Sequence, residues 1–319
     1  MNGSTSSRFC HLCGQPLAGR FFRYAHGLVV CLACQSARIR CARCGAPLAD
    51  AAVASASGSP PASDEPLCAR CLRTAPRCAC CGKPIIHVEY TFEELLTLPA
   101  KRRFCETCVK HQPRCDICRA PVPRVAATLP DGQFRCAACA QEMILDERAV
   151  RAVYDHARAL LGQAAGIHLQ SLPRLAVVGR REMGEVRRRF AAELPAEAGG
   201  HHVLGFFVRD HLAEKVYVEM GLPRPLLLGT LAHELAHAWQ IKAAPALNDE
   251  VVREGFAEWV SHHVLVAAGY QQAAARATRR DDLYGRGLRH FLNIERRHGM
   301  AAVLERARGG PSRSIHTLA

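Results

Sequence analysis

The residues with the clearest potential for chemistry lie in the segment LAHELAHAW, residues 231–239. His233 and His237 are four residues apart, so on a helix they would share one face and could bind a single metal ion. Glu234 would then lie beside that ion. A carboxylate in this position can take a proton from a water whose pKa the metal has lowered. The spacing therefore predicts a hydrolytic zinc site with Glu234 as its catalytic base.

A third metal ligand is expected from the helix that follows. Catalytic zinc usually has three protein ligands and one water, and a predicted helix over residues 250–267 carries Glu254 and Glu258 one turn apart. Glu254 follows His237 by 17 residues, which leaves room for a turn and an antiparallel return. We predict Glu254 as the third ligand. Glu258 would either support a ligand histidine or compete with Glu254 for the metal.

Several elements must position these side chains. The motif helix is predicted over 225–242, because proline suits a first helical turn and apolar residues then recur at helical spacing. A helix is also expected over 142–161 and a strand over 172–178. Residues 203–209 and 215–219 alternate like the strands of a hairpin. A strand just before the motif helix would border the cleft and could pair with an extended peptide.

Cysteine is the second conspicuous residue type, and 16 of the 17 cysteines form CxxC pairs. Gaps of 17, 23, 23 and 17 residues alternate with three gaps of six, so the long gaps are predicted to lie within fingers and the short ones between them. This spacing predicts four sequential structural zinc sites with four thiolate ligands each, and cross-braced pairing is the alternative. The predicted ligands are Cys10, Cys13, Cys31, Cys34, Cys41, Cys44, Cys68, Cys71, Cys78, Cys81, Cys105, Cys108, Cys115, Cys118, Cys136 and Cys139.

The fingers form an internal repeat. A shared continuation follows the first pair of each finger, as CGQPL, CGAPL, CGKPI and CRAPV, and a small residue there lets the backbone turn around the metal. Units of this size have no core of their own, so the metal must supply their folding energy. Paired modules with this pattern resemble LIM domains, and the resemblance implies that the array binds proteins.

Length and composition set the remaining expectations. The 319 residues are predicted to form three domains: a LIM-like finger pair (1–75), a second pair (76–143) and a metallopeptidase domain (144–319). The fold class is α+β, with LIM-like or treble-clef-like fingers followed by a mainly helical, gluzincin-type domain with a small sheet. No apolar run approaches twenty residues, and the start of the sequence has no secretory pattern. Cysteines arranged for metal binding then indicate a reducing, cytoplasmic location without membrane association.

The formal net charge of +13 overstates how basic the metal-loaded chain would be. Each zinc with four thiolates carries −2, and a zinc held by two neutral histidines adds +2, so the loaded chain has a net charge of about +7. Aromatic residues make up only 6% of the chain, and no basic stripe interleaved with aromatics stands out. These features disfavour nucleic acid as a partner.

The segment GLPRPLLLGTLAHELAHAWQ, followed by DEVVREGFAEW, resembles the peptidase domain of the ubiquitin-activated LIM-domain peptidases of plants that restrict organ size. The resemblance spans roughly residues 114–310 and includes YGRGLR from Tyr284 onward. It implies that His233, His237 and Glu254 bind zinc and that Glu234 is catalytic.

The predicted function is a zinc-dependent endopeptidase acting on a protein or peptide, with one catalytic and four structural zinc ions. Fingers at the N-terminal end would bind a regulatory protein or the substrate. Tyr284 is the candidate donor to the oxyanion, and His262 and His263 are weaker candidates. The alternative is an adaptor whose peptidase-like domain is inactive or regulatory.

Overall fold

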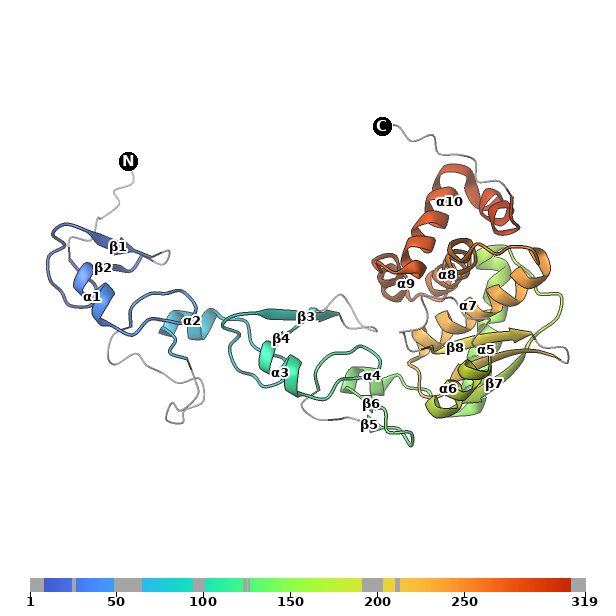
Figure 1. Cartoon of the computed structure of the whole chain (residues 1–319), viewed down its shortest axis with the longest axis horizontal. Coiled ribbons are helices and arrows are strands. Elements are labelled where there is room, and N and C mark those ends of the chain that lie inside the picture. Colours follow the sequence, from blue (N-terminus) through green and yellow to red (C-terminus); the bar gives the residue numbers. More distant parts are fainter. Residues whose placement is uncertain are drawn as a thin grey trace. The chain divides into compact units, whose positions relative to one another are not determined.

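The computed structural model describes residues 9–24, 27–48, 65–93, 101–122, 125, 127–190, 203–209 and 213–310. Contacts within the chain group it into two units (Figure 1). Unit 1 comprises residues 1–93, 101–113 and 120–123, and unit 2 comprises 94–100, 114–119 and everything from 124 onward. All four cysteines of the last predicted finger therefore belong to unit 2. The division into three domains stays a prediction.

The fingers are built from short hairpins and one-turn to two-turn helices. In unit 1 these elements are β1 (Phe21–Arg23), β2 (Val29–Cys31), α1 (Leu32–Ala37), α2 (Ala69–Thr74), β3 (Glu89–Glu93), β4 (Lys101–Cys105) and α3 (Glu106–His111). Unit 2 begins its own finger with β5 (Ala127–Thr128), β6 (Phe134–Arg135) and α4 (Ala137–Gln141). Strand pairs β1–β2, β3–β4 and β5–β6 are antiparallel.

The knuckle turns have the backbone conformation that the repeated sequence predicts. Gly14, Gly45 and Gly82, each directly after a CxxC pair, have φ near +70°. Arg119 occupies the same place in the fourth finger with a φ of 63°, which is uncommon for a residue with a side chain. Each of these residues donates its backbone N–H to the carbonyl of the first cysteine of its pair, at 2.8–2.9 Å. The turn therefore directs both sulfurs of the pair to one side.

Unit 2 contains a small sheet of three strands, β7 (Arg174–Val178), β8 (Gly205–Arg209) and β9 (Glu214–Glu219). The strand order is β7–β9–β8, with β7 parallel and β8 antiparallel to β9. The predicted hairpin is confirmed, and it places β8 at an edge of the described sheet. Val216 and Val218 from the central strand are fully buried and join the main core.

Helices make up the rest of unit 2: α5 (Glu147–Ala165), α6 (Arg180–Arg189), α7 (Arg224–Ala243), α8 (Glu250–Ala267), α9 (Gln271–Thr278) and α10 (Leu283–Ala307). Helix α7 contacts the sheet on one side and α8 on the other, and α10 packs against α8 (Figure 1). Gly299, with a φ of 77°, kinks α10. The core between these helices includes Trp259, Phe256 and Phe291, all fully buried.

The helices that carry the motif agree closely with the sequence prediction. Helix α7 matches the predicted 225–242 to within one residue at each end, and α8 has the predicted bounds. Asp249 caps α8 by accepting the backbone N–H of Val252 at 3.1 Å. Helix α5 begins at Glu147 instead of Glu142, because Asp146 provides the cap, and it ends at the left-handed Gly166 instead of near Gly162.

The structure thus combines helices with small sheets, as the α+β prediction requires in its coarse form. Over the described residues, none of the helices has both the length and the apolar character needed to cross a membrane.

Candidate metal centre

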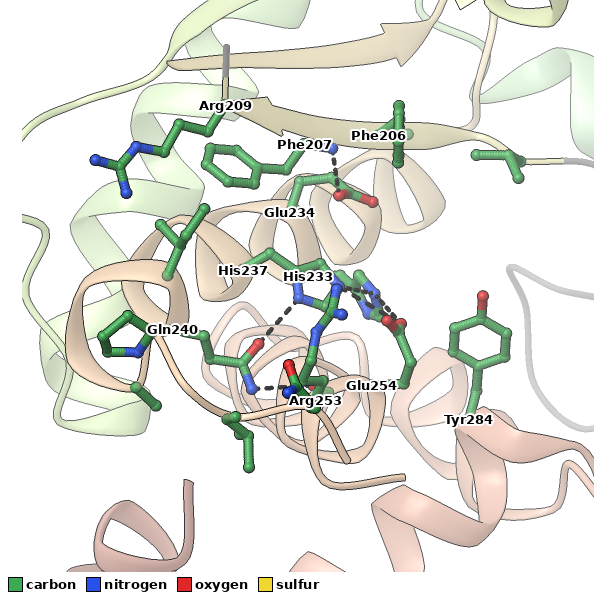
Figure 2. A pocket seen from close by; sticks show the side chains of 17 residues that line it. Phe206, Phe207, Arg209, His233, Glu234, His237, Gln240, Arg253, Glu254 and Tyr284 are labelled. Atoms are coloured by element: carbon green, nitrogen blue, oxygen red, sulfur yellow. Dashed lines mark hydrogen bonds and ion pairs between the residues drawn. The ribbon is translucent and has the colours of Figure 1, made fainter. Parts of the chain in front are cut away.

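Two histidines and one glutamate converge at the contact between α7 and α8. His233 and His237 lie one turn apart on α7, and the antiparallel α8 brings Glu254 against them (Figure 2). His233 Nε2 lies 3.1 Å from His237 Nε2 and 3.2 Å from Glu254 Oε2, and the third side of this triangle is 3.4 Å. The three atoms therefore form a nearly equilateral triangle.

This triangle fits zinc. With zinc bonds of about 2.0–2.1 Å to nitrogen or oxygen, neighbouring ligand atoms of a tetrahedral site stand about 3.3 Å apart. The observed sides of 3.1–3.4 Å match that spacing. Among the described residues only these three ligands make up the group, and all three line a cavity. The geometry selects Glu254 over Glu258, whose carboxylate faces the other nitrogen of His233.

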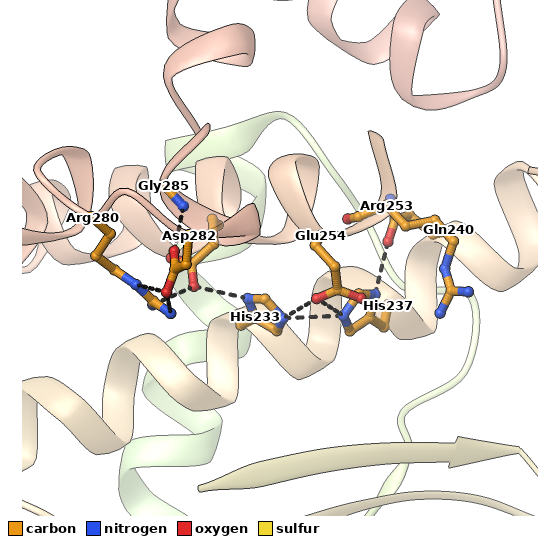
Figure 3. A network of polar contacts seen from close by, with 9 residues as sticks. His233, His237, Gln240, Arg253, Glu254, Arg280, Asp282 and Gly285 are labelled. Carbon is orange, nitrogen blue, oxygen red and sulfur yellow. Dashed lines mark hydrogen bonds and ion pairs between the residues drawn. The ribbon is translucent and has the colours of Figure 1, made fainter. Parts of the chain in front are cut away.

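The ring nitrogens that face away from the triangle have partners of their own (Figure 3). His237 Nδ1 donates to Gln240 Oε1 at 2.9 Å, and Gln240 in turn donates to the carbonyl of Arg253 at 3.1 Å. His233 Nδ1 lies 3.7 Å from Glu258 Oε1. Gln240 therefore holds the proton of His237 on Nδ1 and leaves the lone pair of its Nε2 for a metal, whereas Glu258 faces Nδ1 of His233 from beyond hydrogen-bond distance.

Sequence reasoning missed two members of this outer layer. Gln240 is one helical turn after His237, and that spacing alone could have suggested it. Arg280 donates to Glu258 at 3.3 Å and stacks over the ring of Tyr284 at 4.8 Å, but it comes from the loop before α10. Nothing in its sequence position links Arg280 to the motif helix.

Glu234 lies on the strand side of the histidines. Its Oε2 accepts the backbone N–H of Phe207 at 2.8 Å, so β8 fixes the direction of this carboxylate (Figure 2). The close approach of strand and helix depends on Gly205, because a Cβ at that position would lie 2.4 Å from a methyl of Thr230 and 3.2 Å from Glu234. Glycine at position 205 is therefore a steric requirement of the site.

Tyr284 approaches the triangle from the first turn of α10. Its ring centroid lies 6.0 Å from that of His233, and its side chain lines the cavity beside Glu254 (Figure 2). Helices α8 and α10 cross at Gly255 and Gly287, where a Cβ on either residue would meet the other's backbone at 2.4–2.6 Å. This glycine contact brings α10, and with it Tyr284, close to Glu254.

Burial and charge give the three acidic or phenolic groups different proton affinities. Burial raises the pKa of Glu254, but His237 and His233 outweigh it and hold that pKa well below the usual carboxyl range. Burial raises the pKa of Glu234 above its usual value despite the same two histidines. Burial also raises the pKa of Tyr284, with help from both carboxylates. Glu254 thus suits a metal ligand, Glu234 a proton acceptor and Tyr284 a hydrogen-bond donor.

The pKa of His233 reports how strongly the site attracts positive charge. Burial lowers this pKa, but the hydrogen bond to Glu254 and the charges of Glu234 and Glu258 outweigh burial and raise it to about 9. A dication bound between the ligands would occupy the same favourable potential and displace that proton.

Two cavities meet at the triangle. One has a volume of about 310 Å³ and extends along the second half of α7, past Gln240. The other has about 410 Å³ and extends along the first half of α7 toward Glu258. His233, Glu234 and Tyr284 line both cavities, and β8 borders both. The two cavities therefore adjoin at one side of the candidate metal centre, and only the smaller one is lined by all three ligands.

The four cysteine clusters are sequential, as the gap lengths predict, and the cross-braced pairing is not what the structure has. With zinc–sulfur bonds of about 2.3 Å, neighbouring sulfurs of a tetrahedral site stand about 3.8 Å apart. The distance between the second and third sulfur of each cluster is 3.8 or 3.9 Å. Each cluster could therefore hold one metal ion, plausibly zinc, with all four vertices closed.

The weaker donor candidates lie elsewhere. His262 Nδ1 is 3.3 Å from the carbonyl of Ala274, and His263 Nε2 is 2.9 Å from Glu295. Neither ring lines the two cavities. Comparison with family models, with curated proteins and with solved structures finds no match to this chain.

Proposed function

We propose that this chain is a zinc-dependent endopeptidase, with His233, His237 and Glu254 as the ligands of the catalytic metal. The observation that carries the proposal is the triangle of ligand atoms with sides of 3.1–3.4 Å at the junction of two cavities. The vertex that three ligands leave open on a tetrahedral zinc and the neighbouring carboxylate of Glu234 are the features that separate a catalytic from a structural zinc site.

Zinc bound there would polarise a scissile carbonyl and lower the pKa of a water to about 7. The proton transfer and the hydrogen bond to the oxyanion would then come from the chain's own residues. Glu234, whose pKa burial raises and whose direction Phe207 fixes, accepts the proton of the attacking water and returns it to the leaving amine. Tyr284, kept protonated, donates to the oxygen that gains negative charge.

The edge strand β8 supports an extended peptide as substrate. The carbonyl of Leu204 accepts from Glu219 on β9 at 2.9 Å, so the backbone groups of Gly205, Phe207 and Arg209 are directed away from β9, although the N–H of Phe207 already donates to Glu234. A peptide lying along that side of β8 would pass both cavities and the metal centre. Backbone pairing of this kind holds a peptide without requiring a particular sequence.

The resemblance to ubiquitin-activated LIM-domain peptidases is part of the proposal. It is supported by the placement of Tyr284 and of the Glu254–Gly255 pair around the same site. Unit 1, with its closed cysteine clusters, is proposed to bind a regulatory protein or the substrate itself. An adaptor without activity remains the alternative, and it is favoured by the three closed cysteine clusters of unit 1.

The test is hydrolysis of a broad peptide library by the zinc-loaded full chain. Glu234→Gln is expected to lower kcat at least about 100-fold while five zinc ions stay bound, because general-base catalysis typically contributes 10²–10⁴-fold. Glu185→Gln, a carboxylate change on α6 of the same unit, is the matched control and should retain activity. Full activity of Glu234→Gln, or a wild-type chain that binds only four zinc ions and cleaves nothing, would contradict the proposal.

Tyr284→Phe isolates the oxyanion donor. Loss of one such donor costs about 10²–10³-fold in kcat when the donor acts on the developing charge. KM should change little, and Tyr270→Phe, a phenol packed against the core away from both cavities, is the control. An unchanged kcat would leave Tyr284 as a packing residue only.

A further inference from the structure

The fourth zinc finger differs from the other three in its surroundings. Its four cysteines are all buried, and they belong to unit 2 together with the candidate metal centre. The two residues between the first cysteines, Asp116 and Ile117, both contact other parts of unit 2. The finger is therefore attached to the peptidase-like region by the knuckle itself.

Asp116 anchors the knuckle through charge. Its Oδ1 accepts from the Arg180 guanidinium at 2.9 Å, and its Oδ2 accepts the backbone N–H of Phe134 at 2.7 Å. A second aspartate of the finger, Asp131, accepts the backbone N–H of Arg180 at 3.0 Å. Helix α6 begins at Arg180 and has no side-chain cap from its own N-cap residue, so the finger supplies that cap.

A buried contact joins the finger to the end of β9. Gln133 donates from Nε2 to Glu219 Oε1 at 2.7 Å, and these side chains are only 2% and 1% exposed. Farther along the chain, Met143 forms a β-bridge with Pro223, the residue directly before α7. These contacts fix the position of the finger relative to β9 and to the start of the motif helix. The geometry of buried polar contacts is strongly constrained.

Because the finger is attached in this way, the side chain of Ile117 lies at the larger cavity. Its half-buried side chain packs against the main core of unit 2 and lines the 410 Å³ cavity. Leu226, Leu265, Ala273 and Ala277 add further apolar surface to the same cavity. The volume lies within the range of about 300–1,000 Å³ typical of ligand pockets.

One arginine that lines this cavity is paired with two carboxylates. Arg280 donates to Asp282 at 2.7 Å and to Glu258 at 3.3 Å, so its positive charge is balanced inside the protein. An acidic ligand side chain would have to displace those carboxylates. An apolar side chain, in contrast, would bury its surface against Ile117 and the neighbouring leucines without disturbing the ion pairs of Arg280.

We propose that the larger cavity is a subsite for a bulky apolar side chain of the peptide, and that Ile117 of the fourth zinc finger determines its size. This inference rests on the proposed function, because the cavity shares His233, Glu234 and Tyr284 with the candidate metal centre. The fourth finger is then part of the substrate-binding surface, and its zinc positions a specificity residue.

The experiment compares Ile117→Trp, which fills the cavity, with Ile117→Ala, which enlarges it, and with the conservative Ile117→Val. Leu12, the residue at the same knuckle position of the first finger, provides the matched controls Leu12→Trp and Leu12→Ala in unit 1. Each full-length, zinc-loaded protein is profiled with peptides that carry Phe, Ala or Asp at each position around the cleaved bond. Binding of the same peptides is measured in the Glu234→Gln background.

At one position, the wild-type chain should prefer Phe to Ala and to Asp. Ile117→Trp should reduce the Phe-to-Ala ratio of kcat/KM about tenfold there, because a few methylenes in an apolar pocket change discrimination by 10–200-fold. Ile117→Val should keep most of the preference, and both Leu12 variants should keep all of it. Zinc content should stay at five in every variant.

The subsite proposal would be overturned if the Phe-to-Ala ratio of kcat/KM were the same in the wild type and in all Ile117 variants at every position of the peptide. This holds even when hydrolysis itself is normal. A preference for Asp over Phe at that position would overturn the subsite as well, and would assign recognition to the arginines. If the wild type cleaves nothing but the Glu234→Gln protein binds Phe peptides in an Ile117-dependent manner, the subsite stands and the proposed hydrolysis fails.

Discussion

The cysteine clusters and the histidine–glutamate cluster are both candidate zinc sites, but they are built in opposite ways. Each cysteine cluster takes its ligands from two CxxC knuckles, and the first two clusters pack against small groups of buried apolar residues. The histidine–glutamate cluster takes its ligands from two long helices, over a core that includes Phe256, Trp259 and Phe291. In the fingers of unit 1 a bound metal would organise the chain, whereas at the histidine–glutamate cluster the core organises the ligands.

The comparison also concerns hydrogen bonding around the ligands. The sulfurs of Cys31 and Cys68 accept backbone N–H groups of the short helices that they cap. The histidines instead face side chains, because His237 donates to Gln240 on its own helix and His233 Nδ1 lies 3.7 Å from Glu258 on the next helix. Backbone groups thus serve the sulfurs, whereas side chains surround the imidazoles.

Zinc removal should have the largest effect, and it should affect unit 1 and the helices of unit 2 differently. With a strong chelator, unit 1 should unfold, because binding energies of about 10–16 kcal/mol per structural zinc are its main source of stability. Helices α8 and α10 should persist. Hydrogen exchange measured by peptide mass spectrometry should show full exchange over residues 27–48 and continued protection over 250–267. Readdition of zinc is the control, and simultaneous loss of protection in both regions would contradict the comparison.

A tight helix crossing is the next most sensitive feature. Gly255→Ala should destabilise unit 2 by about 1–3 kcal/mol, because the new methyl would meet the backbone of Gly287 at 2.6 Å and push α10 away. Gly184→Ala is the matched control on α6, where the methyl meets only an arginine tip at 3.7 Å and helix propensity favours alanine by up to ~1 kcal/mol. Denaturant titration of the full chain checks both, and equal effects would refute the crossing argument.

The carboxylate of Glu258, which faces Nδ1 of His233, should affect metal affinity more than stability. Glu258→Gln is expected to weaken the fifth zinc site about 10–100-fold, because loss of an outer partner lets the ligand imidazole reorient. Glu295→Gln removes a comparable carboxylate from His263, which lies away from the cluster, and should leave zinc affinity unchanged. Competition with a chromophoric chelator measures the affinity. Equal affinities for both variants would show that Glu258 is not a partner of the site.

The smallest expected effect is a change in the pH dependence of stability. It concerns His262, a packing histidine that is not one of the predicted metal ligands. Burial lowers the pKa of His262, and the neighbouring His263 adds to this. The unfolded chain therefore takes up a proton more readily than the folded one, so stability is lost as the pH falls through about 6.5. His262→Gln should reduce that loss between pH 8 and 5.5 by less than about 1 kcal/mol, because the ring is partly exposed and solvent screens its charge. Thermal denaturation at both pH values is the measurement, and a steeper pH dependence in the variant would reverse the assignment.

The sequence alone determined the local parts of this protein. The spacing of cysteines predicts sequential clusters, although the two pairs of a cluster are 17 or 23 residues apart and cross-braced pairing stayed open until the structure showed the clusters. The i,i+4 spacing of His233 and His237 specifies a shared helix face. Even the bounds of α8 follow from Asp249 at its cap and from the apolar period behind it.

The tertiary structure decided everything that depends on contacts between distant segments. Glu254 and Glu258 lie one turn apart on α8, and only the packing of α8 on α7 turns one toward Nε2 and the other toward Nδ1 of His233. The attachment of the fourth finger to unit 2 through Asp116 and Gln133 likewise has no local pattern. Short-range spacing fixes which atoms can meet within a turn, whereas the burial of a shared core fixes which turns meet each other.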